Sequence, residues 1–386
     1  MLRYFNMNGV FAIYKPSGIS SAKFLDRVQA TFTESKVFAH DLQQARAKIL
    51  SDLNTDKKWR GGRAEKKASR TKVKIGHGGT LDPLASGVLV VGVGLGTKKL
   101  QFYLSECRKT YETKALLGIS TTTGDSEGEI ITHNEIDHIT SEMVKDATKK
   151  FIGDIKQTPP IFSALKVNGK PLYEYARQGL PLPTSIKVRD VTVYDIKVFE
   201  DDLLSTDHEF KTLVSELDEN GVPKEHGLEN NPTLNDSPLY FSSQYLEKCE
   251  KEEVSSEVGK PKILPSDKDL PEKLPMIHFS SDVSSGTYIR SLISDIGRAL
   301  ESSAYMVELI RTKQSEWELG KNVFTIEDFE KDERIWGAVL KKVLDDGGKD
   351  IDLKSEFEKI ASEVAKESPE QDSHQSKKRS IDEVEN

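Results

Sequence analysis

The sequence predicts a fold that combines β-strands with α-helices, because segments of both periodicities alternate along the chain. Residues 88–93 read Val-Leu-Val-Val-Gly-Val, a short and largely β-branched run that is typical of a strand buried on both faces. Between Leu292 and Leu300 the apolar residues instead recur at helical spacing, which predicts a helix that packs inward. These signals permit a sheet covered by helices, although they do not fix the order of the strands.

Residues 9–21 begin with a strand-like alternation of side chains, which predicts a first strand before Lys15. Lys15 and Pro16 make a turn after this strand. The pair Ser20 and Ser21 then offers a side chain able to cap a helix.

The most informative stretch is residues 76–89, which read G-H-G-G-T-L-D-P-L-A-S-G-V-L. It holds one carboxylate, Asp82, in a glycine-rich loop that leads directly into the buried strand. Glycines at 76, 78, 79 and 87 permit backbone angles closed to other residues, and Pro83 stiffens the turn. We therefore expect Asp82 at a rigid rim, which is how a catalytic group is mounted. The plainer alternative is a solvated Asp that caps a helix.

Three further segments follow the Asp82 loop. Residues 109–118 read K-T-Y-E-T-K-A-L-L-G and carry Lys109 and Tyr111, and a polar stretch reading T-T-T-G-D-S-E-G follows at 121–128. Residues 157–173 read Q-T-P-P-I-F-S-A-L-K-V-N-G-K-P-L-Y, and residues 285–297 begin with S-G-T-Y-I-R and enter the predicted helix.

These five blocks resemble, in the same order, the motifs of the TruB family of RNA pseudouridine synthases. In that family the Asp of a G-H-x-G-T-L-D-P-x-A-S-G-x-L loop is the essential catalytic residue. The resemblance covers about residues 8–199 and 276–325 and implies the α+β pseudouridine synthase fold, a mixed, mostly antiparallel sheet flanked by helices. Many relatives add a C-terminal RNA-binding domain of the PUA type, and the sequence after Asp328 shows no clear counterpart.

The resemblance implies roles for individual residues. Asp82 would be the catalytic carboxylate, Tyr111 would lay its ring against the target base, and Arg290 would pair with Asp82 and keep it ionised. Substrate contacts are expected from His77, Gly79, Thr80, Leu81, Tyr288, Leu309, Lys98 and Lys109. Lys15 and Pro16 are expected to support the active-site floor.

Several of these roles have plainer alternatives. His77 could fix the loop by hydrogen bonds, Tyr288 and Leu309 could be ordinary core residues, and Arg290 could form a surface salt bridge at a helix start.

The implied reaction needs no cofactor. Isomerising uridine to pseudouridine breaks the N1–C1′ bond, turns the uracil and joins C5 to C1′, with nothing gained or lost overall. Asp82 can serve as nucleophile or as base, and the sequence leaves this choice open. The target base must first be flipped out of its stack, at about a few kcal/mol.

The sequence divides the catalytic core into two parts, residues 8–199 and 276–330. Residues 200–275 are acidic and polar with few large apolar residues, which predicts an inserted, largely disordered loop. Residues 331–386 are predicted to form a helix or two and then a flexible charged tail. A basic insertion is predicted at about residues 41–72.

The formal net charge of −8 argues against an RNA partner, but the local distribution of charge favours one. Nine Lys and Arg residues lie between Lys57 and Lys74, just before the Asp82 loop, and Lys98, Lys99, Arg108 and Lys109 follow it. A basic surface near the active site is the electrostatic footprint of phosphate binding. The alternative is a merely solvated basic loop.

Other classes of site find little support. The eight histidines form no cluster at zinc spacing, and residues 92–98 lack the spacing of a nucleotide-binding loop. Cys107 and Cys249 cannot build a disulfide framework, which indicates a reducing compartment. No membrane span or secretory signal is visible. Lys377-Lys378-Arg379 is a candidate nuclear-import signal or a solvated tail, and Met7 offers a second start that could alter targeting. We expect the nucleus and mitochondrion, with the cytoplasm as an alternative.

The expected function is conversion of uridine 55 in the T-arm of tRNA by a stand-alone, monomeric enzyme of fungal type that uses no guide RNA. Messenger RNA sites are left open as further substrates. One alternative is an RNA chaperone that folds the T-arm. Another is a guide-dependent subunit of the dyskerin type.

Overall fold

The structure, a computed structural model, describes residues 6–54, 62–215, 228, 230–265 and 271–367. The cations Lys57, Lys58 and Arg60 and the end of the predicted tail lie outside these residues. The chain divides into two compact units, the first formed by residues 1–104 and 313–386 and the second by residues 105–312.

In the first unit, β1 (Gly9–Lys15) pairs antiparallel with β3 (Ser86–Val93) and parallel with β14 (Val323–Phe324). The short strand β2 (Ile75–His77) pairs antiparallel with β3. All of β3 is buried, which confirms the strand predicted from its apolar sequence.

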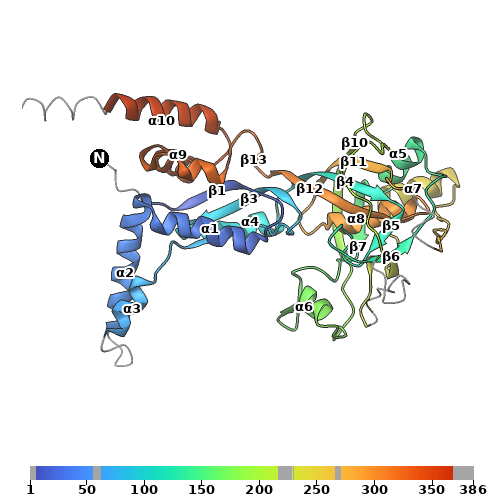
Figure 1. Ribbon diagram of the computed structural model, residues 1–386, viewed down its shortest axis with the longest axis horizontal. Helices are drawn as coiled ribbons and strands as arrows, with labels where there is room; N and C mark the ends of the chain where they lie inside the picture. The colour runs from blue at the N-terminus through green and yellow to red at the C-terminus, as the bar shows by residue number, and fades with distance from the viewer. Residues whose placement is uncertain (1–5, 55–61, 216–227, 229, 266–270, 368–386) are drawn as a thin grey trace, which may run out of the picture. The chain divides into compact units, whose positions relative to one another are not determined.

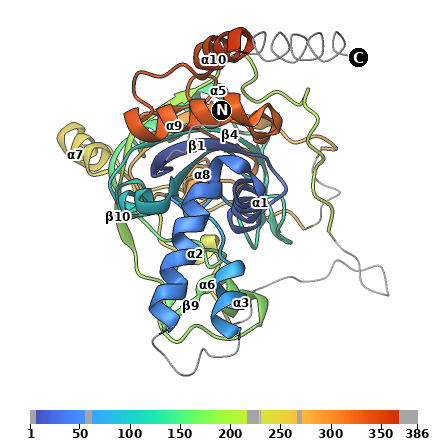
Figure 2. The same cartoon turned by 90° about the vertical axis from the view of Figure 1, so that its left-hand side faces the viewer.

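An aromatic core joins this sheet to its helices. Phe32 stacks on Phe38 with ring centroids 4.7 Å apart, and it also packs against Phe11 and Trp336. Figures 1 and 2 show α9 over β1 and α10 beside α9. The helices of this unit, with the short helix η3, are α1 (Ser21–Glu34), α2 (Ala39–Asn54), α3 (Arg63–Ser69), η3 (Gly94–Lys99), α4 (Leu100–Ser105), α9 (Glu333–Asp346) and α10 (Leu353–Glu367).

In the second unit, the strand order is β12-β4-β11-β10-β7. The pairs β4 with β11, β11 with β10 and β10 with β7 are all antiparallel. The bounds of its main elements are β4 (Lys109–Leu117), β5 (Ile119–Thr121), β6 (Ile130–His133), α5 (Ser141–Lys149), β7 (Gly153–Gln157), α6 (Leu172–Arg177), β10 (Arg189–Val198), β11 (Met276–Val283), α8 (Ile289–Ala299) and β12 (Ala304–Gln314).

Helix α8 is the helix predicted from the spacing between Leu292 and Leu300. Both leucines and Ile296 are at most 1% exposed, so the helix packs inward as expected. The architecture is therefore α+β with mostly antiparallel strands, which confirms the predicted fold class.

Much of the inserted segment differs from the predicted disorder. Residues 230–265 include η4 (Leu234–Asp236) and α7 (Ser243–Glu252), and Leu234 and Cys249 are buried. The backbone N–H of Ser242 donates to the carbonyl of Lys150 at 2.9 Å. Few apolar residues suffice here because the neighbouring core supplies the opposing surface, which a composition argument cannot detect. Residues 216–227, 229 and 266–270 lie outside the described part of the insertion.

The two cysteines form no disulfide with each other. Cys107 and Cys249 are both free thiols in the core. Within the described ranges, no helix is long and apolar enough to cross a membrane. In the same ranges, no three His, Cys, Asp or Glu side chains are grouped closely enough to hold a metal ion.

Candidate active site

The Asp82 loop connects β2 to β3 and turns tightly, with the N–H of Ala85 donating to the Asp82 carbonyl at 3.2 Å. Gly79 and Gly87 have φ values of +145° and +105°, which only glycine adopts readily. Gly78 is required for a different reason, because a Cβ there would lie 2.6 Å from Cβ of Tyr103. The glycines thus serve both backbone angle and close packing, whereas the sequence argument considered only the first.

Lys15 lies beneath this loop and is fully buried. Its ammonium donates to the carbonyls of Pro16 at 2.9 Å, Pro83 at 3.4 Å and Ala85 at 2.6 Å. A charged donor satisfies these carbonyls more strongly than a neutral one. Lys15 therefore holds the backbone on the C-terminal side of Asp82, and the role of Lys15 and Pro16 in an active-site floor stays a prediction.

Ser20 and Ser21, at the start of α1, make different contacts. The Ser20 side chain accepts from the N–H of Lys23 and caps the helix. The Ser21 hydroxyl donates to the carbonyl of Leu81 and accepts from its N–H, both at 2.8 Å. Ser21 thus fixes the residue just before Asp82, a contact that the sequence argument missed because it treated both serines as potential caps.

The other residues of the first unit that were predicted to contact substrate lie within the loop or close to it in sequence. His77 lies half-buried on β2 opposite Val91, and Gly79 and Leu81 are buried. Thr80 is exposed beside them, and Lys98 is exposed in η3. Their contacts with substrate stay predictions.

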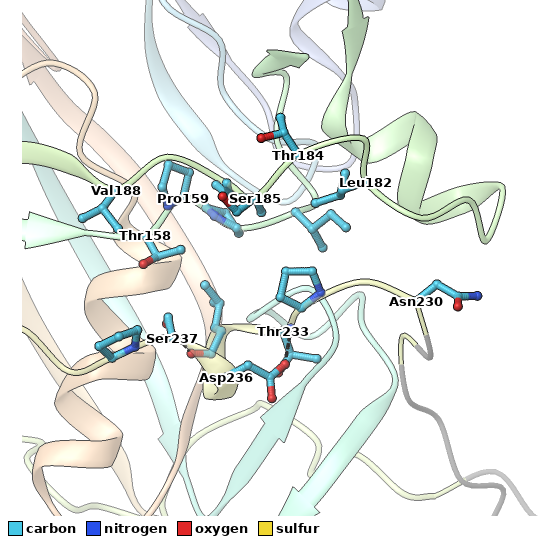
Figure 3. Close-up of a pocket in the computed structure, with 16 residues that line it drawn as sticks. Thr158, Pro159, Leu182, Thr184, Ser185, Val188, Asn230, Thr233, Asp236 and Ser237 are labelled. Carbon is cyan, nitrogen blue, oxygen red and sulfur yellow. Dashed lines mark hydrogen bonds between the residues drawn. The ribbon is translucent and has the colours of Figure 1, made fainter. Parts of the chain in front are cut away.

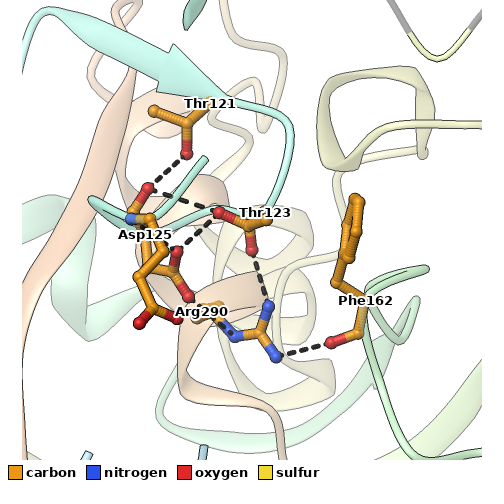
Figure 4. Close-up of polar contacts among 6 residues, drawn as sticks. Thr121, Thr123, Asp125, Phe162 and Arg290 are labelled. Carbon is orange, nitrogen blue, oxygen red and sulfur yellow. Dashed lines mark hydrogen bonds and ion pairs between the residues drawn. The ribbon is translucent and has the colours of Figure 1, made fainter. Parts of the chain in front are cut away.

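In the second unit, Arg290 is held by groups from several distant segments (Figure 4). Its guanidinium donates to the carbonyls of Thr123 at 2.7 Å and Phe162 at 2.8 Å. Its Nε lies 3.7 Å from Oδ2 of Asp125, and both side chains are almost fully buried. The alternative of a surface salt bridge at a helix start is therefore wrong.

Asp125 organises the polar turn that follows β5. Its Oδ1 accepts from the Thr123 hydroxyl at 2.5 Å and from the Glu127 N–H at 3.0 Å, while the Thr121 hydroxyl donates to its carbonyl at 2.8 Å. The turn also pairs with β12 at Met306. The sequence motif at 121–128 includes Asp125, but no role was predicted for it. A single Asp among threonines and glycines could have indicated a carboxylate that organises the turn.

The Q-T-P-P segment fixes the G-T-Y-I-R segment through backbone contacts. The Gln157 side chain accepts from the N–H of Tyr288 at 2.7 Å and donates to its carbonyl at 3.1 Å. The Ser291 hydroxyl donates to the carbonyl of Thr158 at 2.8 Å. These bonds hold the entry to α8 through backbone groups of Tyr288 and Thr158.

Tyr111 and Lys109 lie on the buried face of β4. The Lys109 ammonium donates to the Ser285 hydroxyl at 2.6 Å, and that hydroxyl donates to the carbonyl of Cys107. Burial lowers the pKa of Lys109, and the charge of Arg311 lowers it further. Lys109 thus joins β4 to the segment before α8, a structural role in addition to the substrate contact that was predicted for it. Leu309, expected in the pocket wall, is also buried.

A pocket of about 390 Å³ lies beside the Q-T-P-P segment in the second unit. Figure 3 shows Thr158 and Pro159 on one side and Thr233, Asp236 and Ser237 on the other. The second wall comes from the insertion, so this segment shapes the surface of the second unit.

Asp82 belongs to the first unit, whereas Tyr111 and Arg290 belong to the second. The pairing of Arg290 with Asp82 stays a prediction.

Comparison with known proteins gives a consistent result. Residues 66–216 match the model of the TruB family pseudouridylate synthase N-terminal domain. The chain is 48% identical to tRNA pseudouridine synthase 4 of Saccharomyces cerevisiae over 93% of its length and 90% of that protein. It is 38% identical to the Schizosaccharomyces pombe protein of the same name, covering 83% of this chain and 82% of that one.

More distant relatives were also found. The mouse pseudouridylate synthase TRUB1 is 30% identical, over 84% of this chain and 70% of that protein. Among solved structures, a chain of a Cbf5-Nop10-Gar1 complex matches at 19% identity with a TM-score of 0.44. That match covers 92% of this chain and 59% of the other, so this chain spans about three fifths of its length.

Proposed function

The chain belongs to the TruB family of pseudouridylate synthases, and we propose that it converts uridine to pseudouridine in tRNA, at uridine 55 of the T-arm. The observation that carries this proposal is the clamped Asp82 loop, which Lys15 and Ser21 hold on both sides of the carboxylate. Two yeast relatives that cover most of the chain are named tRNA pseudouridine synthases, which supports tRNA as the substrate.

The proposed reaction balances without any added reactant. The N1–C1′ bond of the uridine breaks, the C5–C1′ bond forms, the C5 proton leaves to solvent and N1 takes up a proton. Asp82 provides the carboxylate for glycosidic cleavage, as nucleophile or as base. A rigid loop suits either role, because a small misplacement of a reacting group can reduce the rate by about 100-fold.

Residues of the second unit would complete this chemistry. Arg290 would pair with Asp82 and orient it, since a guanidinium binds a carboxylate through charge-assisted hydrogen bonds. Tyr111 would provide a flat face for the base after it leaves its stack. The carbonyls and the carboxylate around Arg290 fix its guanidinium before substrate arrives, so that little reorganisation is needed during the reaction.

We propose that the enzyme acts as a monomer without guide RNA. The yeast relatives that support this are named as tRNA enzymes and are similar over nearly their whole length. Messenger RNA sites of similar loop shape are further candidate substrates.

The test uses purified chain alone, treated with nuclease, and a tRNA transcript tritiated at uridine C5. We expect wild type and Asp350→Ala, a variant of an exposed carboxylate in the first unit, to release tritium to water. We expect Asp82→Ala to release none while still binding tRNA. A transcript with cytidine at position 55 should also release none.

Two outcomes would contradict the proposal. Release from the cytidine-55 transcript would place the modification elsewhere in the tRNA. Binding without release by wild type would favour the RNA chaperone or the guide-dependent subunit, and adding guide RNA and partner proteins would separate these two.

A further inference from the structure

The segment just before the Asp82 loop is the most basic part of an acidic chain. Residues 63–74 contain six Lys or Arg residues and one carboxylate, Glu65, whereas the whole chain has a formal charge of −8. The structure describes all of these residues, which belong to the first unit.

Helix α3 directs its cations outward. Its Ala64 and Ala68, one helical turn apart, are buried, and the helix packs against α2 (Figure 2). Lys66 lies on the exposed part of the helix, and Arg70 is exposed at its C-cap.

The chain after α3 keeps the same pattern as it approaches the catalytic loop. Val73 is buried, with its N–H bonded to the Thr33 hydroxyl at 3.1 Å and its carbonyl bonded to Gln29 at 2.9 Å. Lys72 and Lys74, on either side of it, are exposed. Strand β2 begins at the next residue, so α1 fixes the position of these cations beside the strand that carries His77.

We define the basic track as Lys66, Arg70, Lys72 and Lys74. Among the described residues, no ion pair involves any of these four side chains. The charge balance of α10 is different, because its three lysines share the helix with four glutamates, Glu356, Glu358, Glu363 and Glu367. The track is therefore an electropositive surface, whereas α10 is an ordinary solvated face.

We propose that the basic track binds the phosphate backbone of the helical part of the tRNA, independently of base sequence. This proposal rests on the proposed function and adds a second RNA contact to it. Exposed lysine and arginine side chains that lack carboxylate partners bind phosphates by releasing condensed counterions, which gives salt-dependent affinity without base recognition. The track directly precedes the strand and loop that lead to Asp82, so such a contact would position the loop on its substrate.

The test compares wild type with the variant Lys66→Gln/Arg70→Gln/Lys72→Gln/Lys74→Gln. We expect the KM for full tRNA to rise about tenfold or more at moderate salt, with kcat unchanged, because the track does not touch the reacting atoms. In filter binding, the slope of log K against log salt should decrease by about 3.

The matched control is Lys349→Gln/Lys354→Gln/Lys359→Gln/Lys366→Gln, which removes four exposed cations from the same unit. It should behave as wild type in both assays. The variant Lys66→Arg/Lys72→Arg/Lys74→Arg should retain tight binding, and urea unfolding should show that all variants are folded.

Equal KM values and equal salt slopes for the track variant and the control would overturn the proposal. This result is distinguishable from failure of the proposed function, in which wild type releases no tritium from any tRNA. Filter binding still tests the track in that case, because it needs no catalysis.

Discussion

Arg290 and Asp125 form a buried ion pair, with Nε 3.7 Å from Oδ2 and only 5% and 4% of their side-chain surfaces exposed. Removing one member of a buried pair leaves an incompletely compensated charge, which costs about 3 to 5 kcal/mol. In this protein the penalty falls on the arginine expected to orient the catalytic carboxylate.

We therefore expect Asp125→Asn to lower the free energy of unfolding by about 3 kcal/mol and to reduce kcat. Urea unfolding and tritium release measure the two effects. Asp282→Asn is the matched control, because Asp282 also lies 3.7 Å from an arginine, Arg108, whose side chain is 62% exposed. It should lose less than about 1 kcal/mol. Equal losses in both variants would contradict a special role for burial.

The two serines at the start of α1, Ser20 and Ser21, provide a sharper comparison. Ser20→Ala removes a helix cap and should cost about 1 kcal/mol without affecting kcat. Ser21→Ala removes both hydrogen bonds to Leu81, so it should lower kcat as well as stability. Thermal unfolding and single-turnover tritium release separate the effects. Similar kcat values for the two variants would show that Ser21 does not position the loop.

Lys15→Met should leave the carbonyls of Pro83 and Ala85 without their ammonium donor. We expect kcat to fall about 10- to 100-fold with a smaller change in KM, because the loop is displaced while the RNA-binding surface is kept. Steady-state kinetics test this, with Lys354→Met as an exposed control in the same unit. A change confined to KM would instead indicate a substrate contact.

Asp295 should make stability depend on pH. Burial raises the pKa of its carboxyl from 3.8 to about 6, although Arg298 opposes the shift. Between these values the folded state binds more protons than the unfolded state, so the free energy of unfolding falls as pH rises. The group's contribution is fully present below about pH 4 and is lost above about pH 6, an amount of about 3 kcal/mol.

The measurement is urea unfolding of wild type and Asp295→Asn at about pH 4.5 and pH 7. The stability difference between the two proteins should change by about 2 kcal/mol over this range, since the variant lacks the titrating group. Asp350→Asn, which alters an exposed carboxylate, should show no such change. A constant difference for Asp295→Asn would contradict the raised pKa.

The elements that sequence predicted well depend on local chemistry. The buried strand β3 and the inward-facing helix α8 were predictable because burial of a whole strand or one helical face leaves a periodic pattern in neighbouring residues. The turn at Asp82 was predictable because glycine and proline act on the backbone where they stand.

The contacts that could not be predicted from sequence join residues that are far apart in the chain. Arg290 and Thr123 are separated by 167 residues, and nothing local to either one specifies their hydrogen bond. The same reason explains the error over the insertion, because Phe241 is ordered by packing against Phe151, 5.4 Å away between ring centroids. The composition of a segment gives its number of apolar residues, but it does not show which surface of the rest of the protein those residues pack against.

The paired hydrogen bonds between Gln157 and Tyr288 separate two properties of this site. The amide of Gln157 recognises a backbone N–H and C=O, groups that are present whichever residue other than proline stands at 288. Substitution at 288 therefore leaves both backbone groups in place, whereas substitution of Gln157 removes their partner. These two bonds therefore tie the entry of α8 to the identity of residue 157 and not to the identity of residue 288.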